Sequence, residues 1–279
     1  MPLKQETAVQ DSAPVIEEIT NLFQKMNLPY LAQRNLFLGT PYSILENFHR
    51  ALSIQREEDE KKRFINRMRY AGIFRERAEE TFKWDQDTYP FVEPGAIDRV
   101  LTIDFIRQCK NLIVTGPPGA GKSLLVVIIA CKAIRENFSV KYKTAHNIAI
   151  ELKEARDGNS LSGYIKKLQS CDVLIVEDIT FSNFDAKTAK SFFSIIDRRY
   201  GRKTTVVTSN SSIKDWALGL PDKGMCSALL GRLYEEALLV NMNGAADMRL
   251  ERAKGMMEYT DKSEGHKDGL TSLPEGRGH

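Results

Sequence analysis

The chain has 279 residues, of which 42% are hydrophobic and 28% charged, and its formal net charge is +3. This composition is ordinary for a soluble globular protein of one or two domains, and it argues against a fibrous or fully disordered chain. The longest apolar run, near Leu124–Cys131, is shorter than the ~20 residues that a membrane helix needs. The first residues have no apolar core of a signal peptide, so we expect a cytoplasmic protein with no membrane partner.

The cysteines and histidines indicate neither disulfide bonds nor a metal centre. Cysteine occurs four times without a CxxC pair, and the four histidines share no metal-ligand spacing. We expect free thiols in a reducing compartment. We also expect no metal site built from protein ligands alone.

The first third of the chain has the pattern of helices. Residues 1–14 are polar and predict disorder, whereas apolar residues recur every three or four positions through 15–81 and predict a small all-helical domain. Within it, Arg56–Arg69 places acidic residues before basic ones. This stretch predicts a solvated helix with ion pairs between neighbouring turns, or a docking face for protein or DNA. Residues 82–95 hold two prolines and four aromatics, and predict a linker that packs on the next domain.

Strands and helices alternate from about Cys109. The expected strands are Asn111–Thr115, Val140–Lys143, Asp172–Val176, Thr204–Thr208 and Leu238–Asn241. The expected helices are Lys122–Asn137, His146–Ala155, Ser162–Gln169 and Asp185–Tyr200, the last with Asp185 as its N-cap. This order predicts an α/β domain over 96–260 with a mostly parallel sheet flanked by helices. Residues 261–279 predict a disordered tail. Net charge is negative over residues 1–100 and positive afterwards, which weakly favours an anionic partner for the second part.

One motif has a specific chemistry. GPPGAGKS matches G-x-x-x-x-G-K-[ST] completely, follows a predicted strand and begins an apolar helix, as a phosphate-binding loop requires. Its backbone amides and the helix N-terminus favour phosphate. Lys122 is expected to contact the β- and γ-phosphates and Ser123 to bind Mg²⁺, which predicts ATP and Mg²⁺ as cofactors. The expected nucleotide contacts are Gly116, Pro117, Pro118, Gly119, Ala120, Gly121, Lys122, Ser123 and Leu124.

Three further segments could complete a catalytic site. The apolar strand VLIV runs directly into Glu177 and Asp178. We expect this strand to lie beside the phosphate-loop strand, with both carboxylates facing Mg²⁺ and an attacking water at the carboxyl edge of the sheet. Asn210 ends another strand and could orient that water. Arg232 and Arg249 are candidates for an arginine that a neighbouring subunit supplies to the γ-phosphate.

These motifs resemble the IstB/DnaC branch of the AAA+ ATPases, which comprises transposition helpers and replicative helicase loaders. The resemblance covers Val15–Gly255 and is carried by GPPGAGKS, the acid-terminated strand, TSN followed by an Asp-Trp pair (Asp215 and Trp216), and an Arg-Leu pair before the last strand. The segment KMNLPYLAQRN is more similar to the transposition helpers.

By position, the resemblance implies that Glu177 and Asp178 form the second acidic motif. It implies that Asn210 is the first sensor, Arg232 the arginine finger that acts on a neighbouring subunit, and Arg249 the second sensor. It further implies a ring or spiral of subunits that encloses DNA. Basic residues that could face such DNA are Lys153, Arg156, Lys166, Lys167, Arg198, Arg199, Arg202 and Lys203, which would equally suit solvated helix faces and helix C-termini.

The chain departs from the family pattern at three places. Glu precedes Asp at positions 177 and 178, where the family has Asp before Glu. Gly231 replaces the usual Asp before the finger arginine, and GAADMR replaces the usual approach to the second sensor. Asp178 is one methylene shorter than Glu and loses ~1.5 Å of reach. This order therefore predicts slow ATP hydrolysis, which exchanging the two acids is expected to speed.

Four functions are compatible with these residues. We favour a transposition helper, in which ATP-bound subunits oligomerise on DNA and recruit or regulate a transposase through the helical domain. The alternative is a helicase loader that delivers a replicative helicase to single-stranded DNA. A small-molecule kinase would need an acceptor site that the sequence does not offer. A switch that binds nucleotide without hydrolysing it would need neither Asp178 nor Arg232.

Overall fold

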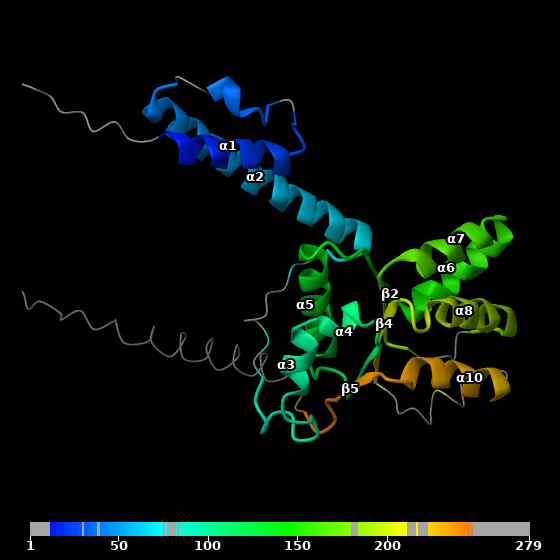
Figure 1. Cartoon of the computed structure of the whole chain (residues 1–279). Helices are drawn as coiled ribbons and strands as arrows, with labels where there is room; N and C mark the ends of the chain where they lie inside the picture. The colour runs from blue at the N-terminus through cyan, green and yellow to red at the C-terminus, as the bar shows by residue number, and fades with distance from the viewer. Residues whose placement is uncertain are drawn as a thin grey trace, which may run out of the picture. The chain divides into compact units, whose positions relative to one another are not determined.

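The computed structural model describes residues 12–29, 31–37, 40–74, 76, 82, 84–179, 184–210, 216, 223–245 and 247. The chain folds into two compact units, Met1–Arg67 and Met68–His279 (Figure 1). The predicted disordered tail and Arg249 lie outside the described residues, as do residues 1–11. Among the described helices, none has the length and apolar character that crossing a membrane requires.

The first unit is helical, in agreement with the periodicity of its sequence. It contains α1 (Ala13–Lys25), the short 3-10 helix η1 (Arg34–Phe37) and most of α2 (Tyr42–Ala71). A small core forms where Ile16, Ile19 and Phe23 of α1 meet Leu45 of α2. These α1 residues are three, four and seven positions apart, so they share one face of the helix. Helix α1 begins within the 1–14 segment predicted to be disordered.

The charged stretch in the middle of α2 forms a solvated helix with ion pairs, one of the two forms predicted for it. Arg56 Nε lies 2.8 Å from Glu60 Oε1, and Lys61 Nζ lies 2.9 Å from Glu58 Oε1. Exposed pairs of this kind contribute little to stability, because solvent and salt screen their charges. They contribute to solubility more than to the fold, and a docking role for this stretch stays a prediction.

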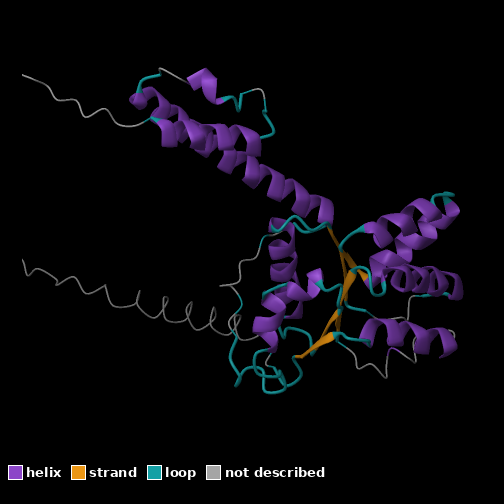
Figure 2. Ribbon diagram, viewed as in Figure 1, coloured by secondary structure: helices purple, strands orange, loops and turns teal. Residues whose placement is uncertain are grey.

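A five-stranded parallel sheet organises the second unit (Figure 2). Its strands are β1 (Leu112–Thr115), β2 (Val140–Thr144), β3 (Val173–Glu177), β4 (Thr204–Ser209) and β5 (Leu238–Asn241). They lie in the order β2-β3-β4-β1-β5, and every neighbouring pair is parallel. The predicted α/β class is confirmed.

One predicted neighbour relation is wrong. The acid-terminated strand β3 does not lie beside the phosphate-loop strand β1, because β4 pairs with both and lies between them. The crossover that leaves β1 through α5 (Lys122–Arg135) carries the chain to β2 at the far edge of the sheet. Strands β3 and β4 then fill the two positions in between.

Helices cover both faces of the sheet (Figure 1). Helix α5 lies on one face with the short helices α3 (Ala96–Leu101) and α4 (Asp104–Arg107), which the sequence did not predict. The other face carries α6 (Ala145–Asp157), α7 (Leu161–Ser170), α8 (Ala186–Arg199) and α10 (Lys223–Tyr234). The carboxylate of Asp185 accepts a hydrogen bond from Thr188 N at 2.7 Å, which confirms the predicted N-cap of α8.

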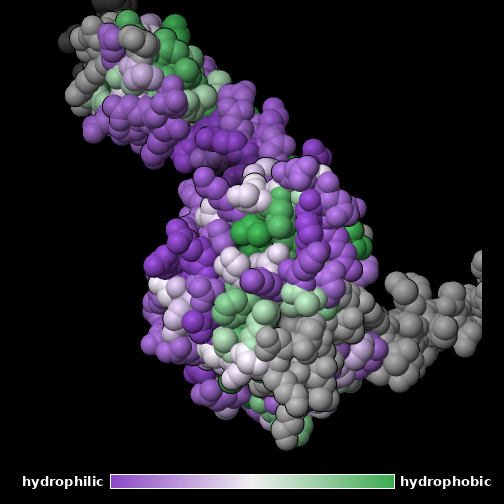
Figure 3. Space-filling model, turned by 90° about the vertical axis from the view of Figure 1, so that its right-hand side faces the viewer, coloured by the Kyte–Doolittle hydropathy of each residue, from purple (hydrophilic) through white to green (hydrophobic). Residues whose placement is uncertain are grey.

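The main core lies between the sheet and this second group of helices. Ile113, Leu174, Val176 and Val207 alternate along their strands and are fully buried there. Figure 3 turns this helical side toward the viewer and shows patches of hydrophobic side chains among hydrophilic ones on its surface. The neighbouring residues Leu112, Val114, Val173, Ile175 and Val206 are also fully buried, and they point to the opposite face of the sheet, as in buried parallel sheets.

The last turn of α2 belongs to the second unit and lies against the edge strand β2. Lys141 Nζ donates to Tyr70 O at 2.8 Å and lies 3.2 Å from the centroid of the Tyr70 ring. Burial, together with the nearby charge of Lys167, lowers the pKa of Lys141 to about 8. Gly72 adopts φ +91°, and a Cβ at this position would lie 2.8 Å from Tyr142 O. The chain therefore passes β2 with no room for a side chain at position 72.

The aromatic segment before α3 packs on the second unit. Phe82 and Trp84 both stack on Tyr89, whose side chain is fully buried. Phe91 lies against Gly244, where a Cβ would approach its ring to 2.9 Å. These contacts agree with the predicted packing of residues 82–95.

Candidate functional site

The phosphate loop connects β1 to α5. Lys122 is buried, and its Nζ donates to Gly116 O at 2.8 Å and to Pro117 O at 2.7 Å. Both acceptors belong to the loop, so the ammonium group lies within it. Gly119 adopts φ +81°, a conformation that strains any side chain, and a Cβ there would clash with the Asp247 carboxylate unless that side chain moved.

The first acid, Glu177, lies beside the start of α5. Ser123 Oγ donates to Glu177 Oε1, and Tyr142 Oη donates to Glu177 Oε2 at 2.5 Å. Helix α5 packs against β2, β3 and β4, which brings its first turn to the end of β3 although β3 and β1 are not neighbours. The prediction that Ser123 and Glu177 share a site is therefore consistent with the fold, while the reason for their proximity is the crossing of α5.

The second acid, Asp178, follows the end of β3 in an unusual backbone conformation. Its φ is +50°, in the left-handed region that few residues other than glycine adopt, with Asp and Asn among those that do. Asp178 N donates to Thr208 Oγ1 at 3.0 Å, and Ile179 N donates to Thr208 O at 2.9 Å. Asn210 Nδ2 donates to Asp178 Oδ1 at 3.1 Å. Strand β4 therefore holds Asp178 from both its backbone and its side chain.

Two further hydrogen bonds fix Ser209, the last residue of β4. Trp216 is buried, and its Nε1 donates to Ser209 Oγ at 2.8 Å, while Ser209 O accepts from Gly116 N at 3.2 Å. These bonds connect the end of β4 to Gly116, the first residue of the phosphate loop. Five predicted residues thus meet at the carboxyl edge of the sheet, namely Lys122, Ser123, Glu177, Asp178 and Asn210.

Arg232 does not join them. It lies near the end of α10, where its Nε donates to Asp197 and its guanidinium lies 5.7 Å from the ring centroids of Phe193 and Tyr200. Helices α8 and α10 each end just before a parallel strand begins, so their last turns lie at the amino edge of the sheet. The phosphate loop lies at the carboxyl edge, and Arg232 is therefore placed away from the site of its own chain.

A buried asparagine fixes the end of α10 in this position. Asn111 Nδ2 donates to Arg232 O at 2.9 Å and to Leu233 O at 3.2 Å, and its Oδ1 accepts from Thr205 N at 2.9 Å. The side chain ties the last turn of the helix to the amino ends of β1 and β4.

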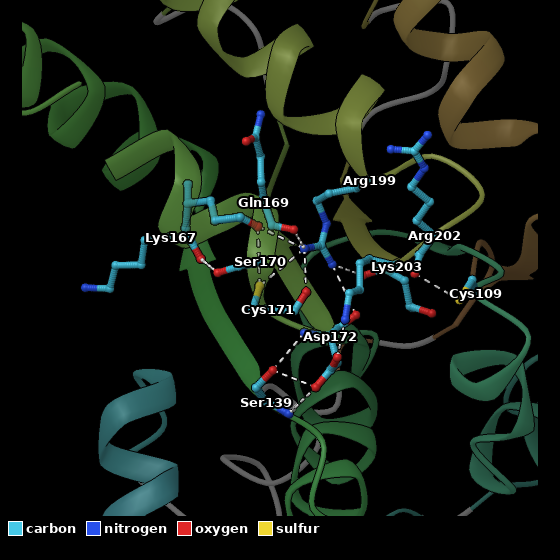
Figure 4. A network of polar contacts seen from close by, with 12 residues as sticks. Cys109, Ser139, Lys167, Gln169, Ser170, Cys171, Asp172, Arg199, Arg202 and Lys203 are labelled. Carbon is cyan, nitrogen blue, oxygen red and sulfur yellow. Dashed lines mark hydrogen bonds and ion pairs between the residues drawn. The ribbon is translucent and has the colours of Figure 1, made fainter. Parts of the chain in front are cut away.

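Among the predicted DNA contacts, Arg199 is wrong. Its side chain is fully buried and donates to Leu168 O at 2.8 Å, to Cys171 O at 2.7 Å and to Thr205 Oγ1 at 3.2 Å (Figure 4). The guanidinium also donates to the carbonyl oxygens of Asp172 and Thr204. All of its nitrogens thus donate to the chain just before β3 and β4 or at their first residues, and none faces solvent. A cluster of four basic residues in the sequence cannot reveal which member points inward.

The other basic candidates differ in their surroundings. Lys203 Nζ lies 2.5 Å from Asp172 Oδ1. Burial opposes ionisation of this carboxyl, but the hydrogen bonds from Lys203 and Ser139 prevail and lower the pKa of Asp172 to about 2. Arg156 and Lys153 share Asp185, at 3.9 and 4.0 Å. Lys153 is nevertheless exposed, as are Lys166 and Lys167 on α7, Arg198 in the last turn of α8 and Arg202 just beyond it.

The side chains at the carboxyl edge suit a magnesium ion that binds together with phosphates. Hydroxyl and carboxylate oxygens are the ligands Mg²⁺ prefers, and it is usually held by one or two carboxylates plus substrate phosphates. Ser123 and Glu177 offer this pair side by side. Within the described residues, no group of three or more His, Cys, Asp or Glu side chains could hold a metal ion.

Sequence reasoning missed Tyr142 and Thr208 at the site, and Asn111 at the opposite edge of the sheet. Tyr142 contacts the side chain of Glu177 and Thr208 accepts from the backbone N–H of Asp178, so only the strand order and register bring them there. Asn111 directly precedes β1, and its buried polar side chain belongs to no motif. An isolated polar residue at the start of an apolar strand was the single available signal.

The fold and this edge together define an ATP-binding AAA+ protein with a phosphate loop and a second acidic motif. The model of the IstB-like ATP binding protein family matches residues 39–255. The chain belongs to this family.

Its relatives come from bacterial insertion sequences. The chain is 26% identical over 253 residues to a protein of Geobacillus stearothermophilus named as a putative ATP-binding protein of IS5376, covering 89% of this chain and 99% of that protein. It is 25% identical over 233 residues to the corresponding IS232 protein of Bacillus thuringiensis subsp. berliner, covering 82% and 92%.

Solved structures share the fold. The replication initiator DnaA, solved with AMPPCP and single-stranded DNA, aligns with a TM-score of 0.52 at 18% identity over 66% of this chain and 55% of that chain. DnaI aligns with a TM-score of 0.50 at 18% identity over 60% of this chain and 90% of that chain. At this identity the likeness concerns the fold alone.

Proposed function

We propose that this protein is a transposition helper that binds ATP and Mg²⁺, oligomerises on DNA, hydrolyses ATP slowly, and recruits or regulates a transposase. The observation that carries the proposal is the gathering of Lys122, Ser123, Glu177, Asp178 and Asn210 at one edge of the sheet. The names of the insertion-sequence relatives favour a transposase over a helicase as the partner.

Each residue has a task in this proposal. Lys122 would neutralise the β- and γ-phosphates, and Ser123 and Glu177 would hold the ion, whose positive charge would favour transfer of the phosphoryl group. Asp178 accepts a proton from water as its oxygen attacks the γ-phosphorus, which releases ADP and inorganic phosphate. Asn210 keeps the Asp178 carboxylate oriented through the 3.1 Å hydrogen bond.

Arg232 acts on a neighbouring subunit in this proposal. Its distance from its own phosphate loop supports that assignment, because a finger that served its own nucleotide would have to lie at the carboxyl edge. Oligomerisation then couples ATP binding to the assembly on DNA, where the exposed basic residues Lys166, Lys167, Arg198 and Arg202 contact phosphates. Lys153, Arg156 and Lys203, each paired with an acid, contribute less, and Arg249 remains a proposed second sensor.

Binding to nucleic acid provides the test. We expect the protein to retain DNA only with ATP and Mg²⁺, with an affinity that falls steeply as salt rises because phosphate contacts release counterions. Lys122→Ala should remove both ATP hydrolysis and ATP-dependent retention, whereas Lys132→Ala, at the far end of the same helix, should leave both unchanged. Retention that ignores ATP and Lys122 would contradict the proposal. Loading of a helicase with no response to a transposase would favour the helicase-loader alternative.

A further inference from the structure

Both carboxylate oxygens of Glu177 have a donor. Oε1 accepts from Ser123, which the proposed function makes a magnesium ligand, and Oε2 accepts from Tyr142 at 2.5 Å. One oxygen therefore faces the ion's position and the other is held from the opposite side. Tyr142 is not part of any motif that identifies the site.

The strand register explains why Tyr142 reaches this oxygen. On the parallel pair β2 and β3, Thr144 lies opposite Glu177 and Tyr142 lies opposite Ile175. Tyr142 is thus two positions back on the neighbouring strand and shares a face with Glu177, a diagonal spacing that long side chains bridge. The ring has two torsions, and its backbone is held by the ladder and by Gly72. The donor position is therefore well defined.

We propose that Tyr142 is a positioning residue for magnesium, which holds Glu177 Oε2 so that Oε1 stays directed at Ser123 and the ion. This inference rests on the proposed function and extends it. Partners that orient a metal-binding side chain typically change metal affinity by 10–100-fold when they are removed.

The chemistry of the pair suits this role. A phenol hydroxyl is a hydrogen-bond donor at neutral pH, and that of Tyr142 reaches Glu177 Oε2 at 2.5 Å. A glutamate has one more torsion than an aspartate, so its carboxylate needs a second contact to keep one orientation. Tyr142 supplies that contact.

The experiment removes a single hydroxyl. We would measure binding of a non-hydrolysable ATP analogue as Mg²⁺ is titrated, and again in EDTA, for the wild type and Tyr142→Phe. The matched control is Tyr234→Phe, which removes a buried hydroxyl at the end of α10 that has no hydrogen-bond partner among the described residues. Thermal unfolding of all three proteins monitors folding.

We expect Tyr142→Phe to raise the Mg²⁺ concentration for half-maximal binding by about tenfold, with unchanged binding in EDTA and an unchanged control. Equal Mg²⁺ dependence in Tyr142→Phe and wild type would overturn the inference and leave the proposed function standing. Equal loss with and without Mg²⁺ would also overturn it, since that pattern means general damage. If the wild type bound the analogue independently of Mg²⁺, the magnesium part of the proposed function would fail and the inference with it.

A double-mutant cycle tests the pair directly. Glu177→Asp should raise the Mg²⁺ concentration for half-maximal binding severalfold in the wild type. The same substitution should have a smaller effect in Tyr142→Phe, because the tyrosine hydrogen bond that it disrupts is already absent there. Additive effects of the two substitutions would contradict the inference.

Discussion

At the scale of single residues, the structure gives a local reason for the order of the two acids. Glu177 has enough length to meet Ser123 and Tyr142 at once. Asp178 occupies φ +50°, a conformation that Asp tolerates better than Glu because its short side chain can hydrogen-bond locally. In the family's order, an Asp at 177 would be too short for both contacts, and a Glu at 178 would tolerate the left-handed conformation less well.

The first prediction reverses what the sequence suggests. Exchanging the acids, with Glu177→Asp together with Asp178→Glu, should slow ATP hydrolysis by on the order of 10²-fold, because displacements of about 1 Å have that effect. Steady-state phosphate release at saturating Mg²⁺ measures it, and each single variant should also be slower than the wild type. A double variant that hydrolyses faster would show that reach alone limits the rate.

Residues in contiguous motifs could be predicted, and residues that depend on register could not. Lys122, Ser123 and Glu177 were found because each stands at a fixed offset from a strand or a glycine. Tyr142 and Thr208 carry no such offset, since their roles depend on which strand lies beside which. Arg199 was misassigned because its charge is visible in the sequence and its burial is not.

At the scale of secondary-structure elements, Arg199 joins α8 to the chain before β3 and β4. Its guanidinium satisfies carbonyl groups at the end of α7 and at the starts of both strands. A neutral residue here would leave several buried acceptors without a donor, at a cost of about 1–3 kcal/mol for each such group.

We therefore predict that Arg199→Met lowers the free energy of unfolding by roughly 2–4 kcal/mol. The exposed neighbour Arg198 provides a matched control. Arg198→Met should change the free energy of unfolding by no more than about 0.5 kcal/mol. Urea unfolding followed by circular dichroism measures both. Similar values for the two variants would refute a structural role for Arg199.

The strands themselves were well predicted, and their order in the sheet less so. All five strands and the N-cap at Asp185 appear within one or two residues of the expected positions, because apolar runs and capping residues are local signals. Helices α3, α4 and α10 were not predicted, and of these α3 and α4 have only six and four residues, too few for a helical period. The position of β4 between β1 and β3 follows from the long crossover that leads from β1 through α5 to β2. No local sequence pattern predicts where such a crossover places the next strand.

At the scale of the whole molecule, Arg232 contacts Asp197 at the amino edge of the sheet and not the phosphate loop of its own chain. We predict that Arg232→Ala lowers ATP hydrolysis by about 10³-fold or more while ATP binding is retained. Mixing it with Lys122→Ala should restore part of the activity, because mixed neighbours combine an intact nucleotide site with an intact finger.

Phosphate release across a series of mixing ratios measures this complementation. The control is Lys190→Ala, an exposed position on α8 that should behave as wild type. Activity that simply follows the sum of the two variants would contradict a shared site. Loss of ATP binding in Arg232→Ala alone would indicate damage to the amino edge of the sheet instead.

The contact between the end of α2 and β2 determines where an autonomous fragment of the second unit can begin. The motif pattern places that start near residue 96, yet a fragment cut there would lack Tyr70, whose carbonyl accepts from the buried ammonium of Lys141. It would also lack the backbone at Gly72 that lies against Tyr142. A fragment that begins ahead of Met68, where the compact second unit starts, keeps both contacts and with them the strand that supports Glu177.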